Sequence, residues 1–364
     1  MTSIRLPRAV AWLAWLITAR SASARRRTHG WPYRLTHGQS RRRAHGRPHS
    51  YDLALAGGLL AGVALDSLLG DPHRGHPVAG FGRAAAALER RAYADNRTRG
   101  ALYTTASVLL AATPAAAASR LTRHHPLARG TAVAITVWAV TGGRSLRSEA
   151  GKTVAALDQH DLAAARTQLS SLCSRDPAQL GPKEIARAVV ESVAENTSDA
   201  VVGPLVWGAL AGLPGLAVYR AVNTLDAMVG YRSPRYTRFG WASARLDDVL
   251  NWAPARLTAV LTAACAPLAG GDPARAWHTA RRDGGHHPSP NAGRPEAAFA
   301  GALGLRLGGA SQYHGVTEHR PELGDGRPPE PADVHRARRL CLAVTLAAAV
   351  FAAAAALMPA REPR

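Results

Sequence analysis

After residue 50 the chain alternates long apolar runs with short polar segments. The clearest run is residues 340–358, which holds no charged side chain and follows the arginines Arg336, Arg338 and Arg339. About 18 or more mainly apolar residues are typical of a transmembrane helix, and arginines at one end favour the cytoplasmic side for that end. The pattern therefore predicts a C-terminal transmembrane helix over residues 340–358.

The other apolar runs are shorter or interrupted. They cover residues 53–69, 101–119, 131–143, 201–222 and 257–268. Gly212 and Pro214 break the fourth of these runs. We predict a mostly α-helical, multi-pass membrane protein with amphipathic helices and polar loops. About five helices should be embedded in the membrane, some of them short or re-entrant.

Three segments between the apolar runs have a more polar character. Residues 145–173 carry leucines at near-helical spacing, which predicts an amphipathic helical region. Pro182 is well placed to begin the next helix. Residues 309–335 are rich in Gly, Pro, Glu and Arg, so we expect a flexible loop there and find no convincing strand pair in the sequence.

The formal charge of +20 is concentrated near the start of the chain. Residues 1–50 hold eleven arginines and no acidic residue, whereas the remainder carries 34 basic and 25 acidic residues. No recognition helix or aromatic stacking platform accompanies this charge, so we do not expect a nucleic-acid partner.

The first 50 residues form a distinct segment. Residues 1–24 resemble a signal peptide, but Arg25, Arg26 and Arg27 follow directly and oppose translocation. We expect residues 1–50 to be a disordered, Arg-rich leader. Residues 51–364 should form a helical membrane enzyme domain.

Carboxylate and carboxamide side chains recur at helical spacing around the run at 201–222. Glu191, Glu195 and Asp199 are four positions apart, and Asn223 and Asp226 are three apart. Asp247 and Asp248 precede Asn251 by four and three positions. Packed together, these sets would form a site for a divalent cation, with oxygen ligands that suit Mg²⁺, or for a cationic substrate. A solvated helix face is the alternative for the first set.

Two other polar features are less specific. The loop between Asp226 and Asp247 contains Arg232, Arg235, Arg238 and Arg245, which suit phosphate oxygens but are also ordinary charges beside a membrane. The rigid loops at 70–77, which includes His76, and at 289–293, which includes Asn291, are either structured turns or parts of a site. The sequence holds neither a P-loop motif nor a serine nucleophile elbow.

Four strings of residues carry a resemblance to a known family. They are LDSLLGDPHRGHPV (65–78), VVESVAENTSDAVVGPLVW (189–207), YRAVNTLDAMVGYRSPRYTRFGWASARLDDVLNWAPARL (219–257) and HPSPNAGRPEAAFAGALGLRLGG (287–309). In this order they resemble the CobD/CbiB family of cobalamin biosynthesis, the membrane-associated adenosylcobinamide-phosphate synthases. The resemblance covers about residues 52–320, and Arg294 departs from it where an aromatic or small residue is expected.

The resemblance implies a multi-pass enzyme of the cell (inner or plasma) membrane. Such enzymes join a propionate of adenosylcobyric acid to aminopropanol or its phosphate through an amide bond. Activation of the carboxylate implies ATP and Mg²⁺ as cofactors. The implied partners are the corrinoid, the amino alcohol, membrane lipid and other cobalamin-assembly enzymes.

We assign roles to the matching residues as a hypothesis. Catalysis is assigned to Glu191, Asp226 and Asp248, with Glu191 or Asp248 as the base toward the substrate ammonium. The metal ligands would be Glu195, Asp199 and Asp247. Substrate binding is assigned to His76, Asn196, Asn223, Arg232, Arg245, Asn251 and Asn291.

Two other functions fit the bare pattern. Membrane prenyltransferases and lipid phosphotransferases bind Mg²⁺-diphosphate through Asp/Asn-rich helix ends, which Asp247, Asp248 and Asn251 match in part. A non-catalytic sensor or transport component, including a regulatory membrane protein of β-lactamase induction, could share the fold. The acid and carboxamide sets favour the enzyme.

Overall fold

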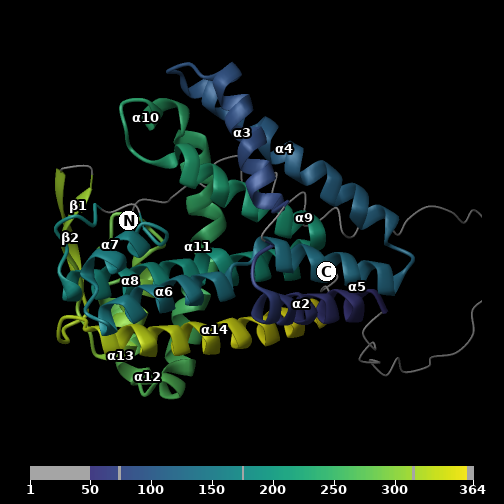
Figure 1. The fold of residues 1–364 in the computed structure, drawn as a ribbon. Helices are drawn as coiled ribbons and strands as arrows, with labels where there is room; N and C mark the ends of the chain where they lie inside the picture. The colour runs from purple at the N-terminus through teal and green to yellow at the C-terminus, as the bar shows by residue number, and fades with distance from the viewer. Residues whose placement is uncertain (1–49, 73–74, 174–175, 314–315, 359–364) are drawn as a thin grey trace, which may run out of the picture. The chain divides into compact units, whose positions relative to one another are not determined.

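The computed structural model describes residues 50–358 except 73–74, 174–175 and 314–315, and it is mostly helical as predicted (Figure 1). The predicted leader lies outside the described residues, apart from Ser50. Within the described part, four helical segments are long and apolar enough to cross a membrane. They are Asp52–Leu69, Arg97–Leu121, Pro182–Gly230 and Pro331–Leu357. The chain is therefore a helical protein of the multi-pass membrane type.

The last of these segments, helix α14 (Pro331–Leu357), contains the predicted C-terminal transmembrane helix. It begins nine residues earlier than the apolar run, because Glu330 and Asp333 form a capping box at its start. Large apolar side chains such as Leu346 and Val350 are exposed along it, which is typical of contact with lipid.

Helix α2 (Ser50–Leu69) packs closely against helix α5 (Pro126–Val140) through two glycines. A Cβ atom on Gly58 would lie 2.7 Å from the carbonyl oxygen of Gly130, and one on Gly62 would lie 2.4 Å from Cβ of Val137. This Gly-x-x-x-Gly spacing lets two helix backbones approach in an apolar environment. The short apolar run at 131–143, most of which forms α5, thus packs beside α2.

The third apolar segment turns back on itself. It comprises helix α8 (Pro182–Thr197), the π-helical turn η2 (Ser198–Val202), helix α9 (Gly203–Leu225) and the π-helical turn η3 (Asp226–Gly230). Gly212 has φ 63° and ψ −143°, which is not helical. A Cβ on Gly215 would lie 2.0 Å from the carbonyl oxygen of Trp207, whereas residues eight apart in a straight helix are roughly 12 Å apart. The two halves of α9 therefore form an antiparallel helical hairpin.

The length of the hairpin indicates a re-entrant segment. Its arms, residues 200–211 and 213–222, are apolar except for Arg220 and reach roughly 15–18 Å at 1.5 Å per residue. The hydrocarbon core of a bilayer is about 30 Å thick, so the arms would cross about half of it. The break predicted at Gly212 and Pro214 is the tip of this hairpin.

Helix α11 (Trp241–Cys265) packs against the hairpin and carries Pro254 in its interior. Proline has no N–H, so the carbonyl of Leu250 lacks its normal helical donor. The indole N–H of Trp207, on the first arm, donates to that carbonyl at 3.0 Å. The hairpin and α11 are thus joined where the proline opens the helix.

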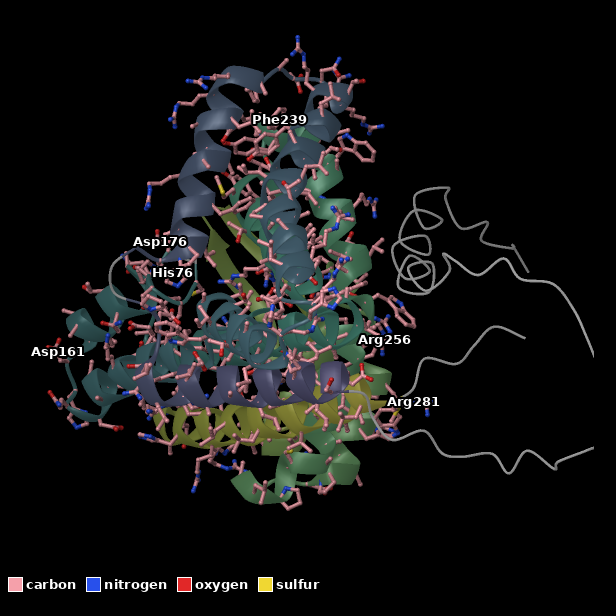
Figure 2. The ribbon with its side chains drawn as sticks, turned by 90° about the vertical axis from the view of Figure 1, so that its right-hand side faces the viewer. His76, Asp161, Asp176, Phe239, Arg256 and Arg281 are labelled. Carbon is pink, nitrogen blue, oxygen red and sulfur yellow. The ribbon has the colours of Figure 1, made fainter. Side chains whose placement is uncertain are left out.

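A smaller core lies where helices α3 (Pro77–Ala92), α4 (Arg97–Leu121) and α10 (Tyr236–Phe239) meet (Figure 1). Phe239 is buried there, 4.9 Å from the ring of Tyr103, and lies near the top of the view in Figure 2. The carboxylate of Glu89 accepts hydrogen bonds from Arg235 at 3.2 Å and Tyr236 at 2.9 Å. These contacts hold the loop between α9 and α11 against α3.

The remaining helices complete the larger core. They are α6 (Gly143–Asp158), α7 (Leu162–Leu169), the 3₁₀ turn η4 (Ala266–Ala269), α12 (Pro273–Arg282) and α13 (Gly293–Leu303). The buried leucines Leu157 and Leu169 confirm the amphipathic region predicted at 145–173, and α8 begins at Pro182 as predicted.

The prediction of a flexible loop over residues 309–335 without strands was wrong. Strands β1 (Leu307–Tyr313) and β2 (Val316–Leu323) pair antiparallel, and α14 begins at Pro331. Helix α8 anchors β1, because Arg187 donates to the carbonyls of Gly308 and Ala310. The Gly and Pro content of this segment suggests only turns, and its contacts with the distant side chain of Arg187 cannot be predicted from local sequence.

Candidate functional site

The carboxylates predicted to converge lie around the open end of the helical hairpin. The negative charges of Asp247, Glu195 and Asp226 all act on Asp199, and those of Asp226 and Asp248 act on Asp247. We call these five residues, Glu195, Asp199, Asp226, Asp247 and Asp248, the acid cluster. The structure thus brings together residues from α8, both π-helical turns and α11.

The hairpin explains how Asp199 and Asp226 meet. They are 27 positions apart in the sequence, but the turn at Gly212 returns the chain to the same end. Each of them lies in a π-helical turn at that end. Single π-helical turns are rare and occur frequently at functional sites.

A buried hydrogen-bond network joins the hairpin to α11. The hydroxyl of Tyr219 donates to Oδ1 of Asn251 at 2.6 Å and also lies 3.1 Å from the carbonyl oxygen of Asp199. Nδ2 of Asn251 in turn donates to Oδ2 of Asp247 at 2.9 Å. The network fixes Oδ2 of Asp247 and leaves Oδ1 buried, and the carboxamide of Asn223 lies close enough to stabilise the charge of this carboxylate.

Burial changes the acidity of the carboxylates on α11. Burial, reinforced by the charge of Asp226, raises the pKa of Asp247 to about 7. Burial also raises the pKa of Asp248, but Arg245 and Arg232 oppose that shift. A carboxyl group that titrates near neutral pH suits proton transfer or cation binding.

Two of the four arginines predicted to lie in a loop, Arg232 and Arg245, flank Asp248, although Arg245 is on α11 and Arg238 is on α10. Nη1 of Arg245 lies 3.6 Å from Oδ2 of Asp248, and the charge of Arg232 acts on the same carboxylate. Arg235 is instead paired with Glu89 at 3.2 Å, and Arg238 lies 3.8 Å from Asp95. The ion pairs of Arg235 and Arg238 thus help to hold the segment between α9 and α11 against α3 and α4.

The predicted substrate-binding side chains have different surroundings. Asn196 donates to the carbonyl of Ser192 at 2.9 Å, one turn back on α8. His76 caps the start of α3, where Nδ1 accepts from the backbone N–H of Val78 at 3.2 Å. Asn291 donates to the backbone carbonyl of Asp248 at 2.8 Å, so the loop before α13 braces α11 beside the acid cluster.

Glu191 lies at a different place. It is 5% exposed, and Oε1 accepts from the backbone N–H of Gly308 in β1 at 2.7 Å. Its charge acts on His287, whose pKa is lowered to about 4 chiefly by burial. The contacts described for Glu191 thus tie α8 to β1, and its role as a base stays a prediction.

Two residues of the site, Tyr219 and Arg220, were missed in the sequence. Asp71 lies in the loop at 70–77, for which the sequence left a structured turn and a part of a site as alternatives. Nη1 of Arg220 lies 3.3 Å from Oδ1 of Asn223, and the charges of Asp71 and Asp199 act on this guanidinium. Arg220 is three positions before Asn223, so the helical spacing of a basic residue and a carboxamide is the signal that places it on the same helix face.

The oxygen atoms of the acid cluster are of the kind that Mg²⁺ prefers. In the part of the chain that the structure describes, no three His, Cys, Asp or Glu side chains are close enough to hold a metal ion. The buried Oδ1 of Asp247 is nevertheless the kind of atom that a cation would satisfy. The ligand set Glu195, Asp199 and Asp247 therefore remains a prediction.

Comparison with known proteins identifies the family. Residues 59–341 match the family model described as CobD/Cbib protein. The chain is 53% identical over 296 residues to the cobalamin biosynthesis protein CobD of Mycobacterium tuberculosis, covering 81% of this chain and 94% of that protein. The proteins of the same description from Geobacter metallireducens and Chromobacterium violaceum are 44% and 43% identical over 301 residues, covering 80% and 79% of this chain and 95% of each relative. No solved structure matches the chain. The chain belongs to the CobD/CbiB family of cobalamin biosynthesis proteins.

Proposed function

We propose that this protein forms the amide bond between adenosylcobyric acid and aminopropanol or its phosphate, at the f propionate of the corrin ring. The product would be cobinamide or cobinamide phosphate, and the enzyme would act in the cell membrane with ATP and Mg²⁺. The observation that carries the proposal is the acid cluster, flanked by Arg232 and Arg245 at the open end of the hairpin. Membership of a cobalamin biosynthesis family supports the choice of substrate.

The charge of the site suits an amine substrate. Several carboxylates lie near one another and repel, so a bound cation lowers the free energy of the cluster. An ammonium group could donate hydrogen bonds to these oxygens and then pass a proton to Asp248 or Asp247 before the nitrogen attacks. The free amine is the nucleophile, so proton removal must come before amide formation.

The arginines suit the second requirement of the reaction. A carboxylate is a poor electrophile toward an amine at neutral pH. ATP would transfer its γ-phosphoryl group to the carboxylate, giving an acyl phosphate and ADP, and Mg²⁺ would neutralise phosphate charge. Arg232 and Arg245 lie beside Asp248, where their guanidinium groups could bind the phosphate oxygens. The phosphate would leave as the amine nitrogen bonds to the carbonyl carbon.

A growth test separates this function from the alternatives. A cobalamin auxotroph lacking the amidation step should grow on cobyric acid when it carries this chain, and on cobinamide with or without it. Growth that still requires cobinamide would refute the proposal. Turnover of a polyprenyl diphosphate by the purified protein would instead support a prenyl or lipid transferase.

A further inference from the structure

The hydroxyl of Tyr219 lies where three segments meet. Tyr219 is on the second arm of the hairpin and is 1% exposed. Its hydroxyl lies 2.6 Å from Oδ1 of Asn251 on α11 and 3.1 Å from the carbonyl oxygen of Asp199 in η2. Its ring lies directly against Gly203, where a Cβ atom would come within 2.1 Å of the ring. The hydroxyl therefore has little freedom to move.

This contact determines the orientation of the Asn251 amide. A phenol that donates its proton needs the carboxamide oxygen as acceptor, so Oδ1 faces Tyr219. The amide nitrogen then faces Oδ2 of Asp247, to which it donates at 2.9 Å. In the flipped amide, Oδ1 of Asn251 would face Oδ2 of Asp247, which is repulsive when Asp247 is ionised. With the Asp247 carboxylate ionised, only this orientation pairs a donor with an acceptor at both ends.

The orientation of Asp247 follows from that of Asn251. With Oδ2 held by the Asn251 amide, Oδ1 is the oxygen left for a ligand; it is buried, and the Asn223 carboxamide lies close by. The charge of Asp226 acts on the same carboxylate, so Asp247 is part of the acid cluster. A chain of two hydrogen bonds thus extends from the hairpin to a carboxylate of the site.

We propose that Tyr219 is a positioning residue, which acts through Asn251 to present Oδ1 of Asp247 to a cationic ligand in the acid cluster. The ligand class is an ammonium group or a divalent cation, both of which need a carboxylate oxygen that is already oriented. This inference rests on the proposed amide-forming function for its kinetic consequence. The hydrogen-bond chain itself does not depend on that function.

The test begins with Tyr219→Phe in the full chain, reconstituted in lipid. The variant keeps the ring against Gly203 and removes only the hydroxyl. We expect kcat for amide formation to fall roughly tenfold, the effect of one lost hydrogen bond, while KM for the corrinoid changes less than about twofold. Tyr103→Phe is the matched control, because it removes a buried phenol hydroxyl in the smaller core and should leave kcat unchanged.

A double-mutant cycle distinguishes a relay from a general effect on the fold. If Tyr219 acts through Asn251, Tyr219→Phe in an Asn251→Ala background should cause little further loss of kcat. In a preparation whose wild type is active, two results would overturn the proposal. One is a double variant whose fold-loss in kcat is the product of the two single losses, and the other is an unchanged kcat in Tyr219→Phe. An inactive wild-type protein would instead count against the proposed function.

A second cycle tests the chain without activity. The effects of Tyr219→Phe and Asp247→Asn on the free energy of unfolding should not add, because the two residues are coupled. We expect this coupling both without a cation and with Mn²⁺ or aminopropanol added as the probe. Independent effects on unfolding under both conditions would show that Tyr219 does not act on Asp247, even in a preparation that forms no amide.

Discussion

Gly203 lies directly against Tyr219, sixteen positions further along the chain, because α9 reverses at Gly212. A Cβ atom on Gly203 would lie 2.1 Å from Cζ of Tyr219, closer than any packed contact. The pair therefore sets the separation of the two hairpin arms and the position of the Tyr219 hydroxyl. A bulkier residue at 203 must push the arms apart.

The first prediction concerns this close approach. Gly203→Ala should lower the free energy of unfolding by about 2 kcal/mol or more, because overpacking displaces the ring of Tyr219. It should also reduce activity, since the Tyr219 hydroxyl would move from Asn251. Gly57→Ala is the control: Gly57 is exposed on α2 with no atom within 4 Å of a Cβ, so the helix should gain stability by up to about 1 kcal/mol. Equal thermal unfolding of the two variants would argue against the tight hairpin.

The second prediction concerns the carbonyl left open by Pro254. Trp207→Phe should destabilise the protein by about 1–3 kcal/mol, because the carbonyl of Leu250 loses the indole donor. In a Pro254→Ala background the restored backbone N–H can bond that carbonyl, so the same substitution should cost much less. The unfolding free energies of the wild type, the two single variants and the double variant give the coupling between Trp207 and Pro254 directly. An identical cost in both backgrounds would show that the indole contact does not compensate for the proline.

The third prediction concerns membrane topology. In a background with Cys173, Cys265 and Cys341 replaced, single cysteines at Lys183 and Ala227 should react with a membrane-impermeant maleimide from the same side of the membrane. A cysteine at Leu210, near the hairpin tip, should be protected from both sides. A segment that crossed the bilayer in one pass would place the first two positions on opposite sides.

The fourth prediction concerns pH. The pKa of Asp247 is raised from 3.8 to about 7 in the fold, so the folded protein binds more protons than the unfolded chain between these values. The contribution of Asp247 to stability is therefore present below about pH 4 and is lost progressively as the pH rises to about 7. Asp247→Asn removes the cost of the buried charge, and at pH 8 the variant should be more stable than wild type by up to about 4 kcal/mol.

The comparison that checks this prediction is the thermal unfolding of both proteins between pH 5 and pH 8. The stability difference should shrink toward pH 5. Asp95→Asn serves as the control, because Asp95 is exposed beside Arg238. A difference that does not change with pH would show that Asp247 is not buried as a charged group.

Much of the fold could be predicted because the apolar runs are long. The run at 340–358 became the larger part of α14, and the break at Gly212 and Pro214 became the hairpin tip. The strand pair could not be predicted in the same way. Its first strand is stabilised by Arg187 and Glu191, which lie more than 100 positions earlier in the chain. Such long-range contacts cannot be predicted from local composition.

The site was predictable to the extent that spacing determines which side chains share a helix face. Helical spacing related Asp247 to Asn251, and the structure joins them by a hydrogen bond. Spacing did not reveal that Arg235 pairs with Glu89 rather than with the acid cluster, because that choice depends on how α3 packs. Tyr219 was missed for a similar reason, since its partner Asn251 lies on another helix.

The most direct test of the proposed site is amide formation by the full chain carrying Asp226→Asn or Asp248→Asn. The assay would supply adenosylcobyric acid, aminopropanol phosphate, ATP and Mg²⁺ to membranes with equal amounts of inserted protein, and would detect the cobinamide product by mass. We predict that each variant loses activity at least about 100-fold, while Asp95→Asn keeps it. Near wild-type product formation by both variants would show that the acid cluster is not where the amide bond is made.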